Sequence, residues 1–329
     1  MLDATDPTTG RPGPAPTSER GWAIRRRLRR SGAPPLRAAD LEAAGHAVRE
    51  RQVELPQGAI RVREVGSGPT LLFVHGLLVD GRLWNAVAAQ LADRFHCVLP
   101  DLPLGAHRTP LRSDADRTPE GLARLLTALV ETLGLEDVTV VANDSGGAVT
   151  QLWMDQGGPI ARVVLTPCDM FDRFLPPGFS LYQPLARIPG GLGLVALSSR
   201  LRAVRRLPIA LGALTHREID DALGRSWLAP VQGDRAIRDD VAAFVRGISS
   251  RRLTAAAERL TAFDRPVLLL WAPEQRWFPL AYAERLRAIL PDARLRLIHD
   301  SGVFSPLEQP RAVADAIAAF AARDAEADQ

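Results

Sequence analysis

The segment VTVVANDSGGAV, residues 138–149, joins a mostly apolar run to a helical pattern through a turn of small residues. A short run of this kind is typical of a strand that is buried on both faces of a sheet. Residues 145–155 then have the apolar spacing of a helix. Small residues at Ala142 and Gly146 allow a sharp turn, so that the side chain of Asp144 projects above the sheet near the positive end of that helix.

The alternation of strand and helix continues on both sides of this segment. Residues 53–55 and 60–65 alternate apolar and polar positions around Gln57 and Gly58, which predicts an antiparallel hairpin. Further strands are expected at residues 71–74, 96–99, 162–165, 267–271 and 294–298, and helices at 38–49, 82–95, 120–133, 280–290 and 310–322. This rhythm predicts an α/β fold with a mostly parallel central sheet flanked by helices.

The rhythm is interrupted between residues 169 and 262, where Pro, Gly and amphipathic helical patterns replace the strands. We expect this segment to be a helical cap over the carboxyl edge of the sheet. The core would then be formed by residues 36–168 and 263–325. Residues 1–35 are rich in Pro, Thr, Gly and Arg and are expected to form a disordered arm.

Composition limits the class of protein. The chain has 329 residues, 46% hydrophobic and 24% charged, which is enough apolar material for a sizeable core. The net charge is +3, but the chain contains no lysine and its arginines are scattered among carboxylates, so we expect no nucleic-acid partner. Cys97 and Cys168 have no metal or disulfide spacing, and no signal peptide or membrane span is visible, which favours a cytoplasmic protein without a membrane partner. No phosphate loop or dinucleotide fingerprint stands out, so no metal, nucleotide or flavin cofactor is expected.

A second motif, Phe73-Val74-His75-Gly76, follows an inner strand and resembles the His-Gly turn of the α/β-hydrolase superfamily. The resemblance extends from about Gln52 to the C-terminal helix and implies that fold. It places Asp144 at the nucleophile elbow. The backbone N–H groups of Leu77 and Ser145 would form the oxyanion hole, and His75 would contact the substrate.

Two other interpretations of the elbow are possible. Ser145 would be the nucleophile if Asn143 stood for the first glycine of the motif, but Gly146 and Gly147 belong two and three residues after the nucleophile, which favours Asp144. Alternatively, Asp144 is only the N-cap of the following helix.

An aspartate at the elbow resembles haloalkane dehalogenases and epoxide hydrolases. A carboxylate attacks an sp3 carbon that bears a leaving group and forms an alkyl ester. A histidine then activates the water that attacks the ester carbonyl, while the oxyanion hole stabilises the developing charge.

The partners of Asp144 depart from the family pattern. Val303 stands where the catalytic histidine belongs, ahead of the Glu308-Gln309-Pro310 helix start. His299 would replace it only in a rearranged loop, and otherwise forms a local hydrogen bond at the end of a strand. Gln275 stands where the acid commonly lies, and Asp169 is an alternative acid after the preceding core strand, or else a helix cap.

Two residues of the predicted cap are candidate substrate contacts, Tyr182 and Trp227, and packing is the alternative for each. Epoxide hydrolases use cap tyrosines to protonate the epoxide oxygen. Dehalogenases have a tryptophan after the nucleophile, where this chain has Ser145.

Three functions follow from these observations. The first is a hydrolase that uses Asp144 on a small epoxide, organohalide or ester. The second is a lyase, isomerase or cyclase in which Asp144 is a general acid or base, a chemistry that needs no histidine. The third is an inactive member that binds a small molecule or a protein. The sequence leaves the substrate and the oligomeric state open.

Overall fold

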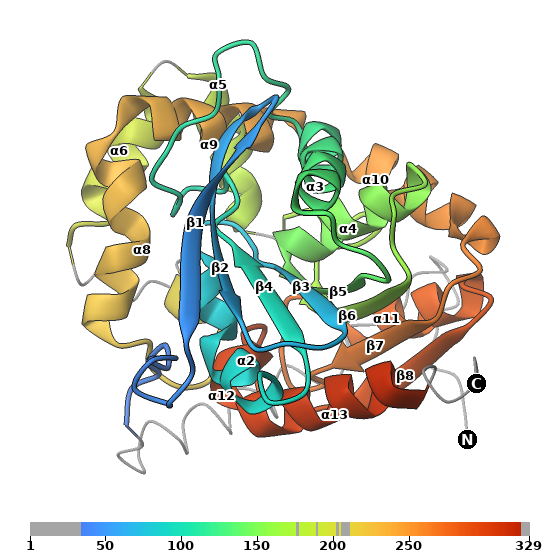
Figure 1. Cartoon of the computed structure of the whole chain (residues 1–329). Coiled ribbons are helices and arrows are strands. Elements are labelled where there is room, and N and C mark those ends of the chain that lie inside the picture. Colours follow the sequence, from blue (N-terminus) through green and yellow to red (C-terminus); the bar gives the residue numbers. More distant parts are fainter. Residues whose placement is uncertain (1–33, 176–177, 189, 202–203, 205–210, 324–329) are drawn as a thin grey trace.

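Eight strands form one sheet at the centre of the chain (Figure 1), in the order β1-β2-β4-β3-β5-β6-β7-β8. The computed structural model describes residues 34–175, 178–188, 190–201, 204 and 211–323. The strands are β1 (Val48–Leu55), β2 (Gly58–Val65), β3 (Thr70–Val74), β4 (His96–Pro100), β5 (Thr139–Asp144), β6 (Arg162–Cys168), β7 (Val267–Trp271) and β8 (Ala293–Leu297). β2 runs antiparallel to β1 and β4, and all pairs from β4 to β8 are parallel. The predicted α/β sheet and its N-terminal hairpin are confirmed.

Helices cover both faces of this sheet. They are α2 (Asn85–Leu91), α3 (Pro119–Leu133), α4 (Ser145–Asp155), α10 (Ser250–Arg259), α11 (Leu280–Ile289), α12 (Ser305–Glu308) and α13 (Pro310–Arg323). On one face α2 packs against α13, and on the other α4 packs between α3 and α10 (Figure 1). Because helices cover both faces, every residue of β5 is buried, as its apolar sequence requires.

The helix expected at residues 38–49 is wrong. Residues 41–45 form a turn, and β1 begins at Val48. The strand is set by its partner and not by its own pattern, because Val48 pairs with Val65 and the Arg51–Glu64 ion pair, at 2.6 Å, crosses the hairpin.

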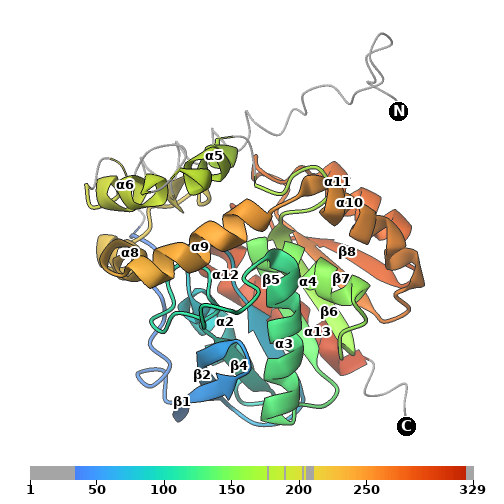
Figure 2. The ribbon, with the colours of Figure 1, turned by 90° about the horizontal axis from the view of Figure 1, so that it is seen from above.

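The cap lies between β6 and β7 and is helical, as predicted. It contains α5 (Tyr182–Arg187), α6 (Gly191–Ser198), α8 (Asp221–Gly233) and α9 (Arg235–Gly247), with 3-10 turns at Phe179–Leu181 and Leu211–Ala213. Viewed from above, α5 and α6 form the outermost layer, with α8 and α9 between them and the sheet (Figure 2). The expected cap boundary at residue 262 differs in one respect, because α10 packs against α4 and belongs to the layer on the sheet.

The beginning of the described chain is attached to the cap. Leu36 forms a parallel bridge with Ile219, in which its N–H donates to Glu218 and its carbonyl accepts from Asp220. Arg217 also donates to the carbonyl of Pro34, at 2.6 Å. The arm predicted at residues 1–35 lies, up to residue 33, outside the described residues.

Buried polar contacts fasten the cap to the core. Asp240 on α9 is 1% exposed and accepts from His107 and from the backbone of Leu111, at 3.1 and 2.9 Å, while its other oxygen faces Arg117 at 3.1 Å.

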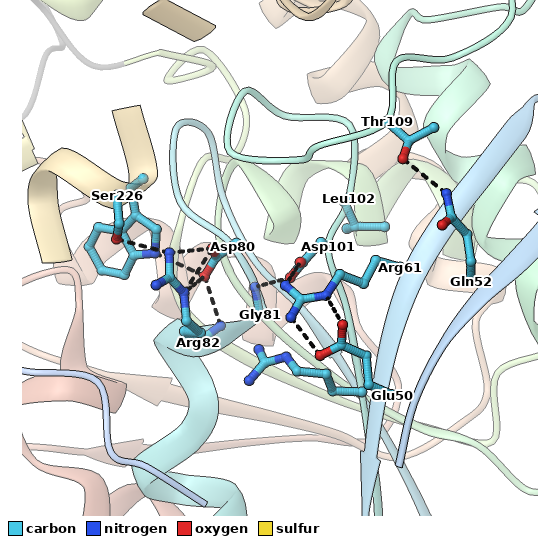
Figure 3. A network of polar contacts seen from close by, with 12 residues as sticks. Glu50, Gln52, Arg61, Asp80, Gly81, Arg82, Asp101, Leu102, Thr109 and Ser226 are labelled. Carbon is cyan, nitrogen blue, oxygen red and sulfur yellow. Dashed lines mark hydrogen bonds and ion pairs between the residues drawn. The ribbon is translucent and has the colours of Figure 1, made fainter. Parts of the chain in front are cut away.

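A second contact between cap and core lies above β4 (Figure 3). Arg82 of the core binds Asp80 and reaches Ser226 on α8, at 2.7 and 3.0 Å. The carboxylate of Asp80 also accepts from the indole of Trp227 on α8, at 2.9 Å. The underside of the cap is therefore fixed to the sheet by charge-assisted hydrogen bonds.

Candidate active site

The turn between β5 and α4 has the backbone geometry of an elbow. Asp144 adopts φ 54° and ψ −133°, a conformation that non-glycine residues rarely adopt. It occupies the N-cap position of α4, but its side chain makes no capping hydrogen bond. The helix-cap interpretation therefore does not explain this aspartate.

Two glycines make room for the strained turn. A Cβ atom at Gly76 would lie 2.2 Å from the Oδ2 atom of Asp144, and one at Gly146 would lie 2.4 Å from the carbonyl oxygen of His75. The two motifs therefore meet at close range: Gly76 lies against the side chain of Asp144, and Gly146 lies against the backbone of His75. A side chain at Gly76 or Gly146 would collide with the other motif, which is why both positions are glycine.

The carboxylate of Asp144 lies in a nearly closed site. The backbone N–H groups of Ser145 and Leu77, which are the two donors expected to form the oxyanion hole, face the carboxylate and favour its charged form. The residue is only 6% exposed. Burial raises the pKa of Asp144 to about 6, although both N–H donors favour the charged form.

A second buried carboxyl group lies beside the first. Asp169 follows β6 directly and is fully buried. It accepts from the Ser145 hydroxyl and from the backbone of Leu175, each at 2.9 Å. Burial and the neighbouring charge of Asp144 raise the pKa of Asp169 well above its ordinary value. The structure thus brings together Asp144, Ser145 and Asp169.

The loop after β8 returns to the elbow, and it brings Val303 there. Asn143, directly before Asp144, donates to the carbonyl of Val303 at 2.9 Å and to Thr166 at 2.8 Å. Val303 itself is fully buried.

His299 does not reach the elbow. Its side chain is 64% exposed and its Nδ1 atom lies 2.7 Å from Glu274. It follows the end of β8, and β8 lies three strands from β5, roughly 14 Å across the sheet. The rearranged loop that His299 would need as the base is absent, and the alternative of a local hydrogen bond describes its position.

A cavity of about 310 Å³ lies between the cap and the oxyanion loop. Leu77 and Leu78 form its floor, and its walls come from α5, α6, α8 and α9. Most of the lining is aliphatic, and Tyr182 is its aromatic member. Asp144 does not line this cavity, but Leu77, whose backbone N–H faces the Asp144 carboxylate, does.

The profile of the alpha/beta hydrolase family matches residues 71–316, about three quarters of the chain. This chain belongs to the α/β-hydrolase family. Its relatives include the uncharacterized protein Rv2715 of Mycobacterium tuberculosis, 28% identical over 275 residues that cover 78% of this chain and 76% of the relative. Haloalkane dehalogenase 2 of the same organism is 27% identical over 275 residues, covering 81% and 93%.

Solved structures show the same fold. Haloalkane dehalogenase DatA from Agrobacterium tumefaciens C58 has a TM-score of 0.71 at 20% identity, covering 86% of this chain and 99% of its own. The epoxide hydrolase CorEH has a TM-score of 0.70 at 18% identity, covering 84% and 99%. At this identity the likeness concerns the fold alone.

In this α/β-hydrolase, His75, which the sequence predicts to contact substrate, lies in a structural position. The side chain is fully buried, and both ring nitrogens are occupied. Nδ1 donates to the carbonyl of Gly76 at 2.9 Å, and Nε2 accepts from the backbone of Leu102 at 2.8 Å. Burial lowers the pKa of His75, which keeps the ring neutral in this role.

The two cap candidates have different positions. Trp227 is fully buried, donates to Asp80 and packs edge-on against Phe304, with ring centroids 6.4 Å apart. It does not line the cavity, so packing is the better description of it. Tyr182 lines the cavity, and its contact with substrate stays a prediction.

Gln275 holds a turn at the usual position of the acid in the hydrolase fold. Its side-chain oxygen accepts from the backbones of Trp277 and Phe278, each at 2.8 Å. In the described residues, no group of three or more His, Cys, Asp or Glu is arranged to hold a metal ion.

Sequence reasoning missed two polar residues that shape the site. Asn143 joins the elbow to the last loop, and Glu308 accepts from Gly302, His216 and Arg217 at 2.7 to 2.9 Å. Burial raises the pKa of Glu308 to about 7. The place of Asn143 within the elbow motif could have indicated its role. The sequence around Glu308 indicates only the start of a helix.

Proposed function

We propose that Asp144 is the nucleophile of a hydrolase that forms an alkyl ester with a small apolar epoxide. The observation that carries this proposal is the placement of one carboxylate on a strained elbow, with the N–H groups of Leu77 and Ser145 directed at it. Such donors stabilise negative charge on the carboxyl oxygen when the ester is later cleaved. Proteins of similar sequence or fold include a haloalkane dehalogenase and an epoxide hydrolase.

In the first step, an oxygen of Asp144 attacks a ring carbon of the epoxide. A carbon–oxygen ester bond forms, the ring carbon–oxygen bond breaks, and the ring oxygen takes the electron pair. Tyr182 supplies the proton to that oxygen, because burial raises the pKa of its phenol and keeps it protonated. Movement of Leu77 or Leu78 at the cavity floor is needed to bring the substrate to the carboxylate.

In the second step, the ester is cleaved without an imidazole. Val303 lies by the elbow where a histidine would activate water, and both oxygens of Asp169 already accept hydrogen bonds. Hydroxide from solvent therefore adds to the ester carbonyl, the ester carbon–oxygen bond breaks, and the diol oxygen leaves and takes the proton, which returns Asp144 to the carboxylate. Tyr182 regains its proton from water. This step is slow and becomes faster with rising pH, so the ester accumulates.

The cavity favours an epoxide over an organohalide. Most of its lining is aliphatic, with Glu218, Asp220 and Asp221 as its acidic members, and the phenol of Tyr182 is a proton donor, which an epoxide oxygen requires and a halide does not. The residue after the nucleophile is Ser145, whose hydroxyl donates to Asp169 and is therefore not directed at a halide.

A second function is favoured by the paired carboxyl groups. Asp144 and Asp169 are both buried with raised pKa values, and Ser145 faces both of them, its hydroxyl donating to Asp169 and its backbone N–H facing Asp144. A group with a pKa of about 6 exchanges protons readily near neutral pH. This arrangement suits a lyase or isomerase in which Asp144 moves a proton and forms no bond to carbon.

Intact-mass measurement separates the two functions. Incubation with styrene oxide or 1,2-epoxyoctane is expected to add the mass of one epoxide to the wild type and nothing to Asp144→Asn. Val303→His is expected to shorten the lifetime of this adduct and to release diol. His299→Gln is the matched control and leaves both adduct and diol unchanged.

Three results would contradict the epoxide proposal. They are an unmodified wild type with no diol, an adduct that persists in Asp144→Asn, and diol formation that depends on His299. A tested compound that is isomerised or cleaved without any adduct, and only when Asp144 is present, would establish the acid–base alternative instead.

A further inference from the structure

Exposed apolar side chains gather on the outer layer of the cap. Among the described residues, six large apolar side chains are exposed, and five of them lie between residues 181 and 201. The five are between 53% and 69% exposed and define the α6 patch: Leu181, Ile188, Leu194, Leu197 and Leu201. Single exposed leucines are ordinary, but a cluster of this kind marks an interaction surface.

Helix α6 (Gly191–Ser198) is apolar on both sides. Five residues from this helix and its C-terminal end line the cavity, and four of them, Leu192, Val195, Ala196 and Ser199, have the spacing of one helical face, with Ser198 as the fifth. Leu194 and Leu197 lie on the opposite face and are exposed. A helix that is apolar all round is normally buried, so the outer face of α6 lacks the cover that its composition calls for.

The same segment is strongly cationic. Residues 173–217 contain seven arginines and no aspartate or glutamate, whereas the whole chain has a net charge of only +3. Arg187 and Arg200 are exposed and flank the α6 patch in sequence. Exposed apolar side chains among arginines are the composition of a surface that binds anionic lipid.

We propose that the α6 patch docks on an anionic lipid surface. Self-association is disfavoured, because the exposed Arg187 and Arg200 flank the patch and like charges on two copies would repel each other. Docking needs no spanning segment, and within the described ranges no helix combines the length and apolar character needed to cross a bilayer. The sequence predicts no membrane partner because it shows no membrane-spanning segment. Binding to a lipid surface does not need such a segment.

The position of α6 places the proposed lipid-binding surface next to the cavity. α5 and α6 are the outermost elements of the cap, and the cavity lies directly beneath them (Figure 2). An apolar compound dissolved in the lipid would reach the cavity through a layer that is aliphatic on both sides. The docking itself does not depend on the chemistry of Asp144.

Vesicle sedimentation of the full chain tests the proposal. We expect binding to vesicles of phosphatidylcholine with roughly one third phosphatidylglycerol, and about tenfold weaker binding to phosphatidylcholine alone or at high salt. Leu194→Ser with Leu197→Ser is expected to weaken binding about tenfold or more. Leu297→Ser is the matched control, since Leu297 is the sixth exposed residue and lies on β8, and it should bind as the wild type does.

Folding and alternative occupants are checked with the same variants. Each variant should keep the circular dichroism spectrum of the wild type, and Arg187→Gln should weaken binding severalfold without touching an apolar side chain. Asp144→Asn should bind vesicles normally, which separates this proposal from the chemical one. Absence of vesicle binding, equal binding by the double variant, or a dimer that the double variant abolishes would each overturn the proposal.

Discussion

Replacing Asp144 with asparagine should abolish ester formation and, at the same time, stabilise the folded chain above neutral pH. The carboxylate is buried and its pKa is raised to about 6, from an ordinary value of 3.8. An acid whose pKa is higher in the folded state than in the unfolded state favours folding while it is protonated. Its ionisation opposes folding, so stability falls as the pH rises from the unfolded to the folded pKa.

The size of this effect follows from the two pKa values. A shift of about 2.2 units corresponds to about 3 kcal/mol of destabilisation once the pH exceeds the folded pKa of about 6. Near pH 5 the same relation gives about 1.6 kcal/mol, and below the unfolded pKa of 3.8 the effect vanishes. Asparagine is isosteric and uncharged, so Asp144→Asn should gain stability along this curve.

Urea unfolding of wild type and Asp144→Asn at several pH values measures the difference. We expect the variant to be more stable by about 3 kcal/mol near pH 8 and by about half of that near pH 5. Asp114→Asn is the control, because the Asp114 side chain is 74% exposed and should change stability little at either pH. A stability difference that is independent of pH, or a variant less stable than the wild type near pH 8, would refute the reasoning.

Three further substitutions test other parts of the structure. Gly76→Ala places a Cβ atom 2.2 Å from the Asp144 carboxylate. It should lower the free energy of unfolding, measured in urea, by about 1–3 kcal/mol and eliminate the mass adduct. An active variant of wild-type stability would contradict this contact. Asp240→Ala leaves His107 and neighbouring donors unpaired between cap and core, and should cost about 3–5 kcal/mol, against less than about 0.5 kcal/mol for the exposed Asp239→Ala. Trp227→Phe removes the indole donor to Asp80 and should lower the free energy of unfolding by about 1–3 kcal/mol. A change in epoxide reactivity without a change in stability would instead identify Trp227 as a substrate contact.

The parts of the fold that the sequence predicted are those with a local signal. β5, α4 and β7 carry apolar patterns of their own, and each lies within one or two residues of its expected range. β1 does not, because it is an edge strand whose first half is mostly exposed and polar. Its conformation is fixed by pairing with β2 and by ion pairs such as Arg61–Glu50, a contact that a sequence window does not contain.

The same distinction holds within the site. The position of Asp144 was predicted because the elbow motif is contiguous. His75 and Trp227 form buried hydrogen bonds with residues 27 and 147 positions away in the chain. A sequence window does not contain these partners, so the imidazole and the indole are candidate substrate contacts in the sequence alone. His299 is a candidate base in the sequence because it lies four residues before Val303. The loop after β8 brings Val303 to the elbow and leaves His299 beside Glu274.

The tether between Asn143 and the last loop has an evolutionary consequence. The amide of Asn143 binds the main-chain carbonyl of residue 303 and not its side chain. Every amino acid offers that carbonyl, so the loop keeps its course whichever residue occupies the position. Selection can therefore remove or restore a histidine there by changing one codon, and the rest of the scaffold need not be rebuilt around it.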